Sequence, residues 1–194
     1  MSRPRNFDQR SVVDAAMQAF WDGGLVATSV DDLLRATGLA RSSLYNSFGS
    51  RETMLELAVQ RYVEQQVVAI RQLFANASVG DALQRLFDDA AVRNFDGRGC
   101  LLVNALGELH AGDASSLQAV RGAFARLAAA LEQAIEQSAP QRADARQLCA
   151  ASMAAIAGLR TLQRAGTPLA LRRDAAARFA TALAGNGCPA PGRA

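Results

Sequence analysis

Apolar residues recur along this chain at the three- and four-residue spacing of helices that are buried on one face. The run Leu83, Leu86, Phe87 and Ala90 is one such stripe, and similar stripes follow one another over most of the sequence. Few windows alternate apolar and polar residues with the period of two that is typical of strands. The pattern therefore predicts an all-α protein with about nine helices.

Capping residues, glycines and prolines divide this pattern into separate elements. The expected helices cover residues 9–21, 30–37, 41–47, 51–74, 79–95, 100–112, 115–137, 142–165 and 168–184. We expect them to form a helix-turn-helix head in residues 1–62 and a helical body in residues 63–185. The Gly- and Pro-rich residues 186–194 are expected to form a disordered tail.

The stretch from Thr28 to Arg51 carries the most specific local pattern, two short helices joined by a tight turn. Ser29 is placed to cap the first helix, and Asp32 three residues later completes a capping box. Gly38 ends this helix because glycine adopts the left-handed conformation without steric cost. The spacing is typical of a helix-turn-helix, in which the second helix enters the major groove of DNA.

The outer face of that second helix carries polar side chains of the kind that contact base edges and phosphates. The base-edge candidates are Ser42, Ser43 and Asn46. The phosphate candidates are Thr28, Arg41, Tyr45 and Arg51. Arg51 is included because it opens the next helix, where free amides and the helix dipole attract an anion.

The run T-S-V-x-x-L-L-x-x-x-G-L-x-x-x-x-L-Y-x-x-F-G-S-R-E, which starts at Thr28, resembles the DNA-binding head of the TetR family of transcriptional repressors. The resemblance covers about the first third of the chain. It implies a ligand-binding and dimerisation body behind the head. Ala40 departs from the family pattern, because many relatives have Ser or Thr there as the cap of the reading helix. Thr37, Ser42 or a DNA phosphate must then satisfy the first amides of that helix.

The charge of the head does not by itself indicate nucleic-acid binding. The whole chain carries a net charge of +3, and all its basic residues are arginines. Residues 1–62 contain seven arginines and seven acidic residues, so the head is neutral. Any attraction to DNA must come from how these charges are distributed.

Several other classes of protein lack support in the sequence. No run is long and apolar enough to span a membrane, and no secretory signal follows the first residues. The three cysteines are widely spaced, which indicates a reducing cytoplasm and neither a disulfide framework nor a zinc site. His110 is the only histidine, and no nucleotide-binding motif is present. We therefore expect no enzyme, no cofactor and no metal.

The body is expected to hold a small-molecule effector in an apolar cavity. Candidate lining residues are Phe74, Phe87, Phe95, Leu102, Leu106 and Phe124. Cys100 is the chemically distinctive residue, because a thiol at a helix start beside Arg98 acquires thiolate character and reacts with oxidants and electrophiles. The stretch from Gly99 to Asn104 also resembles a TetR branch in which some members sense electrophiles. The alternative is that Cys100 is a small buried apolar residue.

The last two helices are expected to form a homodimer, since one reading helix covers too few base pairs for selective binding. Its apolar seam would include Leu148, Ala155, Leu159, Leu162, Phe179 and Leu183. The alternative is that this stripe packs only on its own body. Dimerisation through the last two long helices is also what the TetR resemblance implies.

These expectations together describe a ligand-responsive repressor of the TetR type that binds a palindromic operator in double-stranded DNA. Binding of the effector to the body would act on the head through the helix expected at 50–74, which starts beside the reading helix. The competing hypothesis is an all-helical interaction or ligand-storage protein without DNA binding. The polar face from Arg41 to Asn46 favours the repressor, because a head without DNA contacts would show acidic or apolar residues there.

Overall fold

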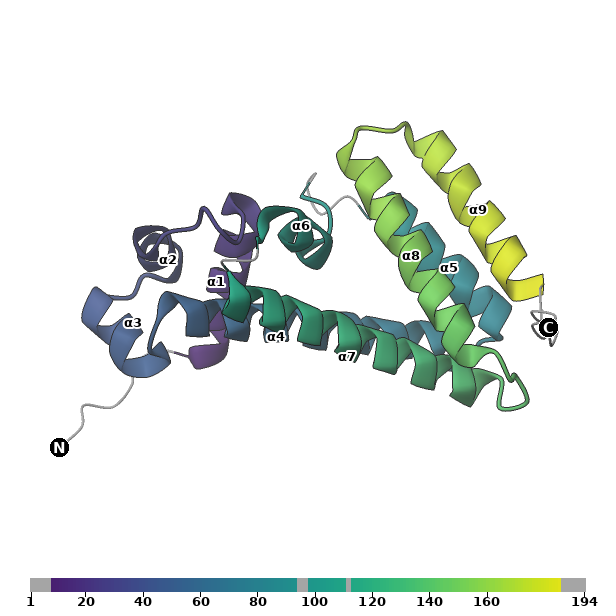
Figure 1. Cartoon of the computed structure of the whole chain (residues 1–194), viewed down its shortest axis with the longest axis horizontal. Helices are drawn as coiled ribbons and strands as arrows, with labels where there is room; N and C mark the ends of the chain where they lie inside the picture. The colour runs from purple at the N-terminus through teal and green to yellow at the C-terminus, as the bar shows by residue number, and fades with distance from the viewer. Residues whose placement is uncertain (1–7, 94–97, 111–112, 186–194) are drawn as a thin grey trace. The chain divides into compact units, whose positions relative to one another are not determined.

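The structure is a computed structural model that describes residues 8–93, 98–110 and 113–185. Within these residues it contains nine α-helices and no strand, as the sequence pattern predicted (Figure 1). The helices are α1 (Gln9–Gly23), α2 (Val30–Thr37), α3 (Arg41–Phe48), α4 (Arg51–Phe74), α5 (Val79–Val92), α6 (Leu101–Glu108), α7 (Ala114–Ser138), α8 (Ala145–Arg164) and α9 (Leu169–Gly185). The expected tail and Phe95 lie outside the described residues.

The chain divides into two compact units whose boundary differs from the expected one. The first unit contains residues 1–65 together with residues 104–124, and the second contains residues 66–103 and 125–194. The sequence pattern did not predict that residues 104–124 associate with the head. The reason is that a stripe of apolar residues shows that a helix is buried without showing which neighbour buries it.

The first unit is built on α1 and the N-terminal half of α4. Ala16, Met17 and Phe20 are almost fully buried on α1. Val12 and Trp21 are also buried on this helix. On α4 a stripe of apolar residues is buried throughout, namely Met54, Leu55, Ala58, Val59 and Tyr62.

Two contacts fix α1 against α4. The Trp21 ring meets Tyr62 edge to face, with the ring centroids 5.2 Å apart. Arg61 Nε donates to Asp14 Oδ1 at 2.6 Å, and the arginine side chain is only 16% exposed. An ion pair that is half shielded from water holds its geometry better than an exposed one. The head is therefore tied together by both apolar and polar contacts.

The second unit has α5 at its centre, with α8 and α9 packed against it (Figure 1). The last carbonyl groups of α5 receive hydrogen bonds from these two helices. Arg160 Nη1 and Gln163 Nε2 of α8 donate to the carbonyl oxygen of Arg93 at 2.7 and 2.8 Å. Arg172 of α9 donates to the carbonyl oxygen of Ala91. Cationic donors are favoured at a helix C-terminus, where the carbonyls lack helical partners.

The end of α6 differs from the expected one. Helix α6 ends at Glu108, whereas the sequence suggested an end near Gly112. The backbone of His110 then donates to Asp113, the residue before α7, so the chain has already left the helix. No helix in the described residues is both long and apolar enough to cross a membrane. These residues also contain no cluster of three side chains suited to hold a metal ion.

Candidate nucleic-acid interface

Helices α2 and α3 form the predicted helix-turn-helix. Ser29 accepts the Asp32 N–H, and Asp32 accepts the Ser29 N–H at 2.8 Å, which confirms the capping box. The Ser29 hydroxyl and backbone are hydrogen-bonded to the Asp32 carboxylate and lower its pKa. Gly38 ends α2 with φ of 68°, the left-handed conformation that the sequence indicated.

Helix α3 presents the predicted polar face to solvent. Leu44 and Phe48 are buried, which fixes the rotation of the helix. Arg41, Ser42, Tyr45 and Asn46 are exposed, and Ser43 is half-buried. Ala40 makes no side-chain cap, as expected, so the first amides of α3 lack a side-chain acceptor. Thr37 Oγ1 accepts only the turn amide of Leu39, at 3.4 Å. An anion at this helix start would supply the missing acceptors.

Arg41 is the exposed cation at the start of α3. In this structure it donates to Asp31 of α2, and both side chains are more than half exposed. An exposed ion pair contributes little to stability and can exchange its partner. Arg41 is thus available for a phosphate, although it must leave Asp31 to bind one.

Arg51 has a different role from the one that its position predicted. Its guanidinium donates to the carbonyl oxygens of Leu25, Val26 and Thr28, with 2.6 Å between Nε and the Thr28 oxygen. The group also lies 5.4 Å from the centroid of the Phe20 ring, and its side chain is 20% exposed. These bonds use the Nε and Nη2 donors, whereas Nη1 lies 3.8 Å from Glu52 Oε1. Arg51 therefore holds the α1–α2 turn, and the phosphate contact stays a prediction.

Thr28 is also a structural residue and not a phosphate contact. It is 3% exposed, and its hydroxyl donates to the carbonyl oxygen of Gly24 at 2.7 Å. A buried hydroxyl with an internal acceptor cannot reach a DNA backbone. The sequence placed Thr28 correctly just before α2 but gave no sign that the turn folds back over it.

Glu108, at the end of α6, holds the same turn from its other side and was missed by the sequence analysis. Its Oε2 accepts the Leu25 N–H at 2.6 Å. A Cβ at Gly24, which has φ of +87°, would come within 2.8 Å of that oxygen, so the carboxylate requires glycine there. Leu25 is thereby bonded to Glu108 through its N–H and to Arg51 through its carbonyl. A lone Glu 83 residues away gave no local signal for this contact.

The structure places the described members of the predicted effector-binding set in different surroundings. Phe74 alone of this set lines a groove of about 590 Å³ in the second unit. Phe87 and Leu102 are fully buried, and Phe87 meets Phe179 with 6.2 Å between ring centroids. Leu106 is 47% exposed and Phe124 half-buried, and both belong to the first unit. Phe87 and Leu102 thus belong to the core of the second unit.

The two described cysteines differ in environment. Cys100 directly precedes α6 and is half-buried. Cys149 is 3% exposed, and its Sγ donates to the carbonyl oxygen of Ala128 at 3.2 Å. Burial, followed by the charge of Glu132, raises the pKa of the Cys149 thiol. Burial therefore makes the Cys149 thiol less reactive than the Cys100 thiol.

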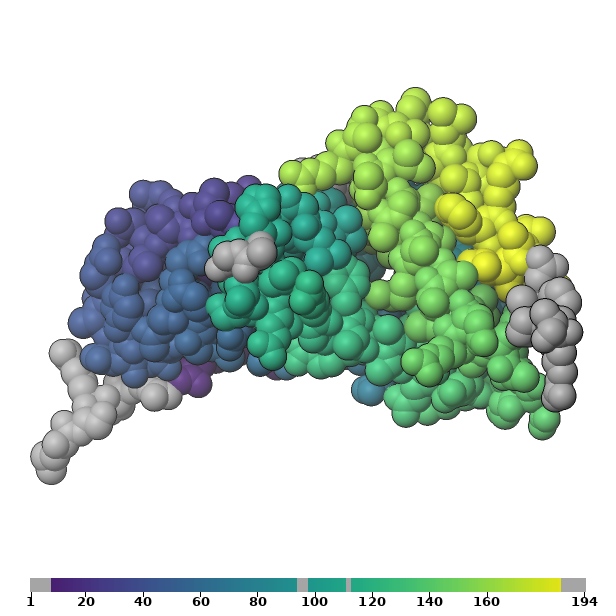
Figure 2. Space-filling view, in the orientation of Figure 1, coloured from purple at the N-terminus to yellow at the C-terminus, as the bar shows by residue number. Residues whose placement is uncertain are grey.

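The predicted dimer seam is only partly exposed. Leu148, Ala155 and Leu159 are at most 5% exposed because they pack inside their own unit. The inference that they face a partner was therefore wrong, since the inner and outer stripes of α8 are both apolar. Leu162 and Phe179 are exposed, and Leu183 is half-buried. Figure 2 shows α9 at the surface of the second unit, where Leu171 is 61% exposed.

The head also matches a known family by its sequence. Residues 12–58, which contain the whole helix-turn-helix, match the model of the bacterial regulatory proteins of the TetR family. The head of the chain is therefore similar to the TetR family of regulators. The arrangement of α2, Gly38 and α3 is the one that the motif indicated.

Curated relatives match about half of the chain. It is 32% identical over 109 residues to YezE of Bacillus subtilis, an uncharacterised HTH-type transcriptional regulator, covering 54% of this chain and 56% of the relative. It is 36% identical over 109 residues to the HTH-type transcriptional repressor ComR of Escherichia coli, covering 53% and 51%. The chain thus spans about half the length of the curated relatives it matches.

Solved structures match the TetR-family fold over nearly the whole chain. A cysteine mutant of the TetR family regulator CifR, complexed with a 26-base-pair operator DNA, aligns with a TM-score of 0.81 at 22% identity, covering 93% of this chain and 99% of that one. FadR of Bacillus subtilis, in complex with stearoyl-CoA, aligns with a TM-score of 0.69 at 14% identity, covering 90% and 98%. At these identities the likeness shows the fold.

Proposed function

We propose that this protein is a transcriptional repressor that binds a palindromic operator through α3 and releases it when a small molecule acts on the body. The observation that carries the proposal is the exposed polar face of α3. It combines Arg41, Tyr45 and Asn46 with a helix start that lacks a side-chain cap. ComR of Escherichia coli is described as a repressor, and the CifR relative was solved on operator DNA. The role contains no catalytic step.

The proposed contacts divide into two kinds. Arg41 and Tyr45 bind phosphates and position the head, whereas Ser42, Ser43 and Asn46 read base edges. The α3 amides add an anion site for the same backbone. Arg51 and Thr28 support this surface from behind by fixing the turn before α2.

A gel shift on the DNA that flanks the gene of this protein tests the proposal. We expect a retarded complex whose affinity falls with salt. Arg41→Ala should reduce the slope of log K against log salt by about one, while Asn46→Ala should change sequence preference. Arg126→Ala, an exposed arginine on α7, is the matched control and should leave both unchanged. Absence of any DNA binding would favour the interaction or storage protein.

We also propose a homodimer through the exposed faces of α8 and α9. Leu162, Leu171 and Phe179 supply exposed apolar area, and Ala154 and Gly158 give α8 a surface of small residues that allows close approach. Two heads would then bind half-sites about 34 Å apart or a multiple of that. Leu148, Ala155 and Leu159 are buried in the core of the second unit, beneath these faces.

Sedimentation of the parent protein and of Gly158→Arg tests the dimer. A Cβ at Gly158 meets nothing within 4 Å, so the substitution adds charge to the surface without disturbing the fold. Gly122→Arg on α7 is matched, because its Cβ position is equally open. We expect a dimer for the parent and Gly122→Arg but a monomer for Gly158→Arg. A parent protein that is monomeric at micromolar concentration refutes the proposal.

Two triggers are proposed for release of DNA. The first is a noncovalent ligand in the body, which the groove beside Phe74 supports. The second is an electrophile or oxidant at Cys100, which the half-buried position directly before α6 supports. Cys100→Ser should retain DNA binding and lose release by quinones, aldehydes or hypochlorite. Equal release from Cys100→Ser and the parent would leave the noncovalent ligand alone.

A further inference from the structure

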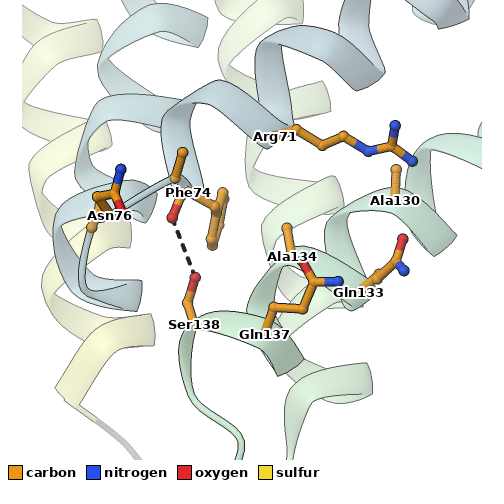
Figure 3. A pocket seen from close by; sticks show the side chains of 10 residues that line it. Arg71, Phe74, Asn76, Ala130, Gln133, Ala134, Gln137 and Ser138 are labelled. Atoms are coloured by element: carbon orange, nitrogen blue, oxygen red, sulfur yellow. Dashed lines mark hydrogen bonds between the residues drawn. The ribbon is translucent and has the colours of Figure 1, made fainter.

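A groove of about 590 Å³ lies between the C-terminal ends of α4 and α7 (Figure 3). Its walls are the last turn of α4, the segment that follows it, and the last turns of α7, all within the second unit. Ser138 donates a long 3.5 Å hydrogen bond to the carbonyl oxygen of Phe74 and connects the two walls. This volume is in the range of sites that hold small organic ligands.

The groove combines an apolar floor with a polar rim. Phe74, Ala130 and Ala134 form the floor and are at most 9% exposed. Arg71 extends from α4 toward Ala130, and Gln133 and Gln137 stand one turn apart on α7 (Figure 3). Arg71, Gln133 and Gln137 are all exposed, so these polar groups border the opening.

The charge of the lining is unbalanced. It contains one arginine and no acidic residue. Among the residues that the structure describes, Arg71 makes no ion pair. The ends of two helices oppose this cation with the partial negative charge of their last carbonyls. The site therefore fits one anionic group at Arg71 and disfavours ligands with several negative charges.

We propose that this groove binds a small carboxylate with an apolar body and is the effector site of the repressor. The carboxylate accepts the two parallel donors of the Arg71 guanidinium, a geometry that arginine offers and a point charge does not. The apolar body covers Phe74, Ala130 and Ala134, and the carboxamides of Gln133 and Gln137 border it. The ligand contacts α4, which is the same helix whose Arg51 holds the α1–α2 turn.

The effector role rests on the proposed function, whereas binding in the groove does not. Calorimetric titration of the full chain with decanoate, below its micelle concentration, tests the site. We expect saturable binding of one decanoate per chain and at least about tenfold weaker binding of decanol, which lacks the charge. Equal binding of decanol and decanoate would show an apolar surface without the proposed anion contact and would overturn the site.

Three variants locate the bound molecule. Arg71→Gln should weaken decanoate binding by about tenfold, because it removes the charge and keeps a polar side chain. Gln133→Trp should abolish binding by filling the groove from an exposed position. Arg126→Gln, on α7 but outside the groove, should bind as the parent does. Undiminished binding by Gln133→Trp would place decanoate elsewhere and overturn the site.

Fluorescence anisotropy of labelled operator DNA tests the effector role separately. Decanoate should weaken operator binding by the parent and by Arg126→Gln, but not by Gln133→Trp. Decanoate that binds in the groove and leaves operator affinity unchanged overturns the effector role. If the chain binds no DNA, the proposed repressor fails, while the calorimetric comparison still decides whether the groove is a carboxylate site.

Discussion

Replacing Glu108 by Ala should loosen the α1–α2 turn. The substitution removes the acceptor of the Leu25 N–H, whose nitrogen lies 2.6 Å from Glu108 Oε2. Leu25 itself is only 2% exposed. A hydrogen bond to a charged acceptor contributes about 1.5–3 kcal/mol, and a buried donor left without an acceptor costs about 1–3 kcal/mol. Glu108 is half-buried, so water can partly replace it and the lower half of these ranges applies.

We therefore expect Glu108→Ala to reduce the free energy of unfolding by about 1–2 kcal/mol. For a chain of this size that lowers the melting temperature by roughly 2–8 °C. Glu108→Gln keeps a carbonyl oxygen within reach and should lose less than Glu108→Ala. Glu136→Ala, which changes an exposed Glu on α7, is the matched control and should stay within about 0.5 kcal/mol.

Hydrogen exchange of the Leu25 amide measures the effect at its source. Each 1.4 kcal/mol removed from the local opening energy speeds exchange about tenfold. Glu108→Ala should accelerate Leu25 and leave the amides of α8 unchanged. If unfolding and Leu25 exchange both match the parent, the contact contributes nothing in solution and the reasoning is refuted.

Three further predictions concern groups that the structure places clearly. Arg51→Ala should destabilise the head by about 1–3 kcal/mol in urea unfolding, because three carbonyls of the turn lose their donor. An unchanged urea midpoint, together with a smaller salt dependence of DNA binding, would instead support the phosphate contact. Since Ser29 lowers the pKa of Asp32, the stability from this capping box is complete above the unfolded pKa of about 4 and is lost as the pH falls through the lower folded value. The difference in unfolding midpoint between the parent and Asp32→Asn should therefore shrink on acidification, and a constant difference would contradict it. Iodoacetamide should alkylate Cys100 faster than Cys149, whose pKa burial raises, as peptide mass spectrometry would show; equal rates would mean that burial does not protect Cys149.

Local features of the head could be predicted because their signals lie within a few residues of one another. The Ser29–Asp32 capping box joins residues three apart in the sequence. Gly38 indicates the turn after α2 because glycine readily adopts the positive φ that this turn requires. The burial of Leu44 follows from helical spacing alone. These features depend on backbone geometry that short segments determine by themselves.

The contacts that the sequence did not reveal join distant residues. Arg51 reaches a turn 23 residues earlier, and Glu108 reaches Leu25 across 83 residues. A charged side chain at a helix end has the same sequence signature whether it binds phosphate, solvent or backbone carbonyls. Leu159 was misassigned for a related reason, since an apolar residue on α8 is equally suited to the core and to a partner.

The hydrogen bonds at the end of α5 have a consequence for synthesis of the protein on the ribosome. The Ala91 carbonyl lacks the hydrogen bond from Arg172 until that residue, 81 positions later, has been translated. At about 5–20 residues per second, this gap lasts roughly 4–16 seconds, and the tunnel delays the contact further. During that time α5 lacks the partners that cover its apolar face. Nascent chains stalled before α9 should therefore be cleaved by protease within α5, whereas chains stalled after α9 should resist.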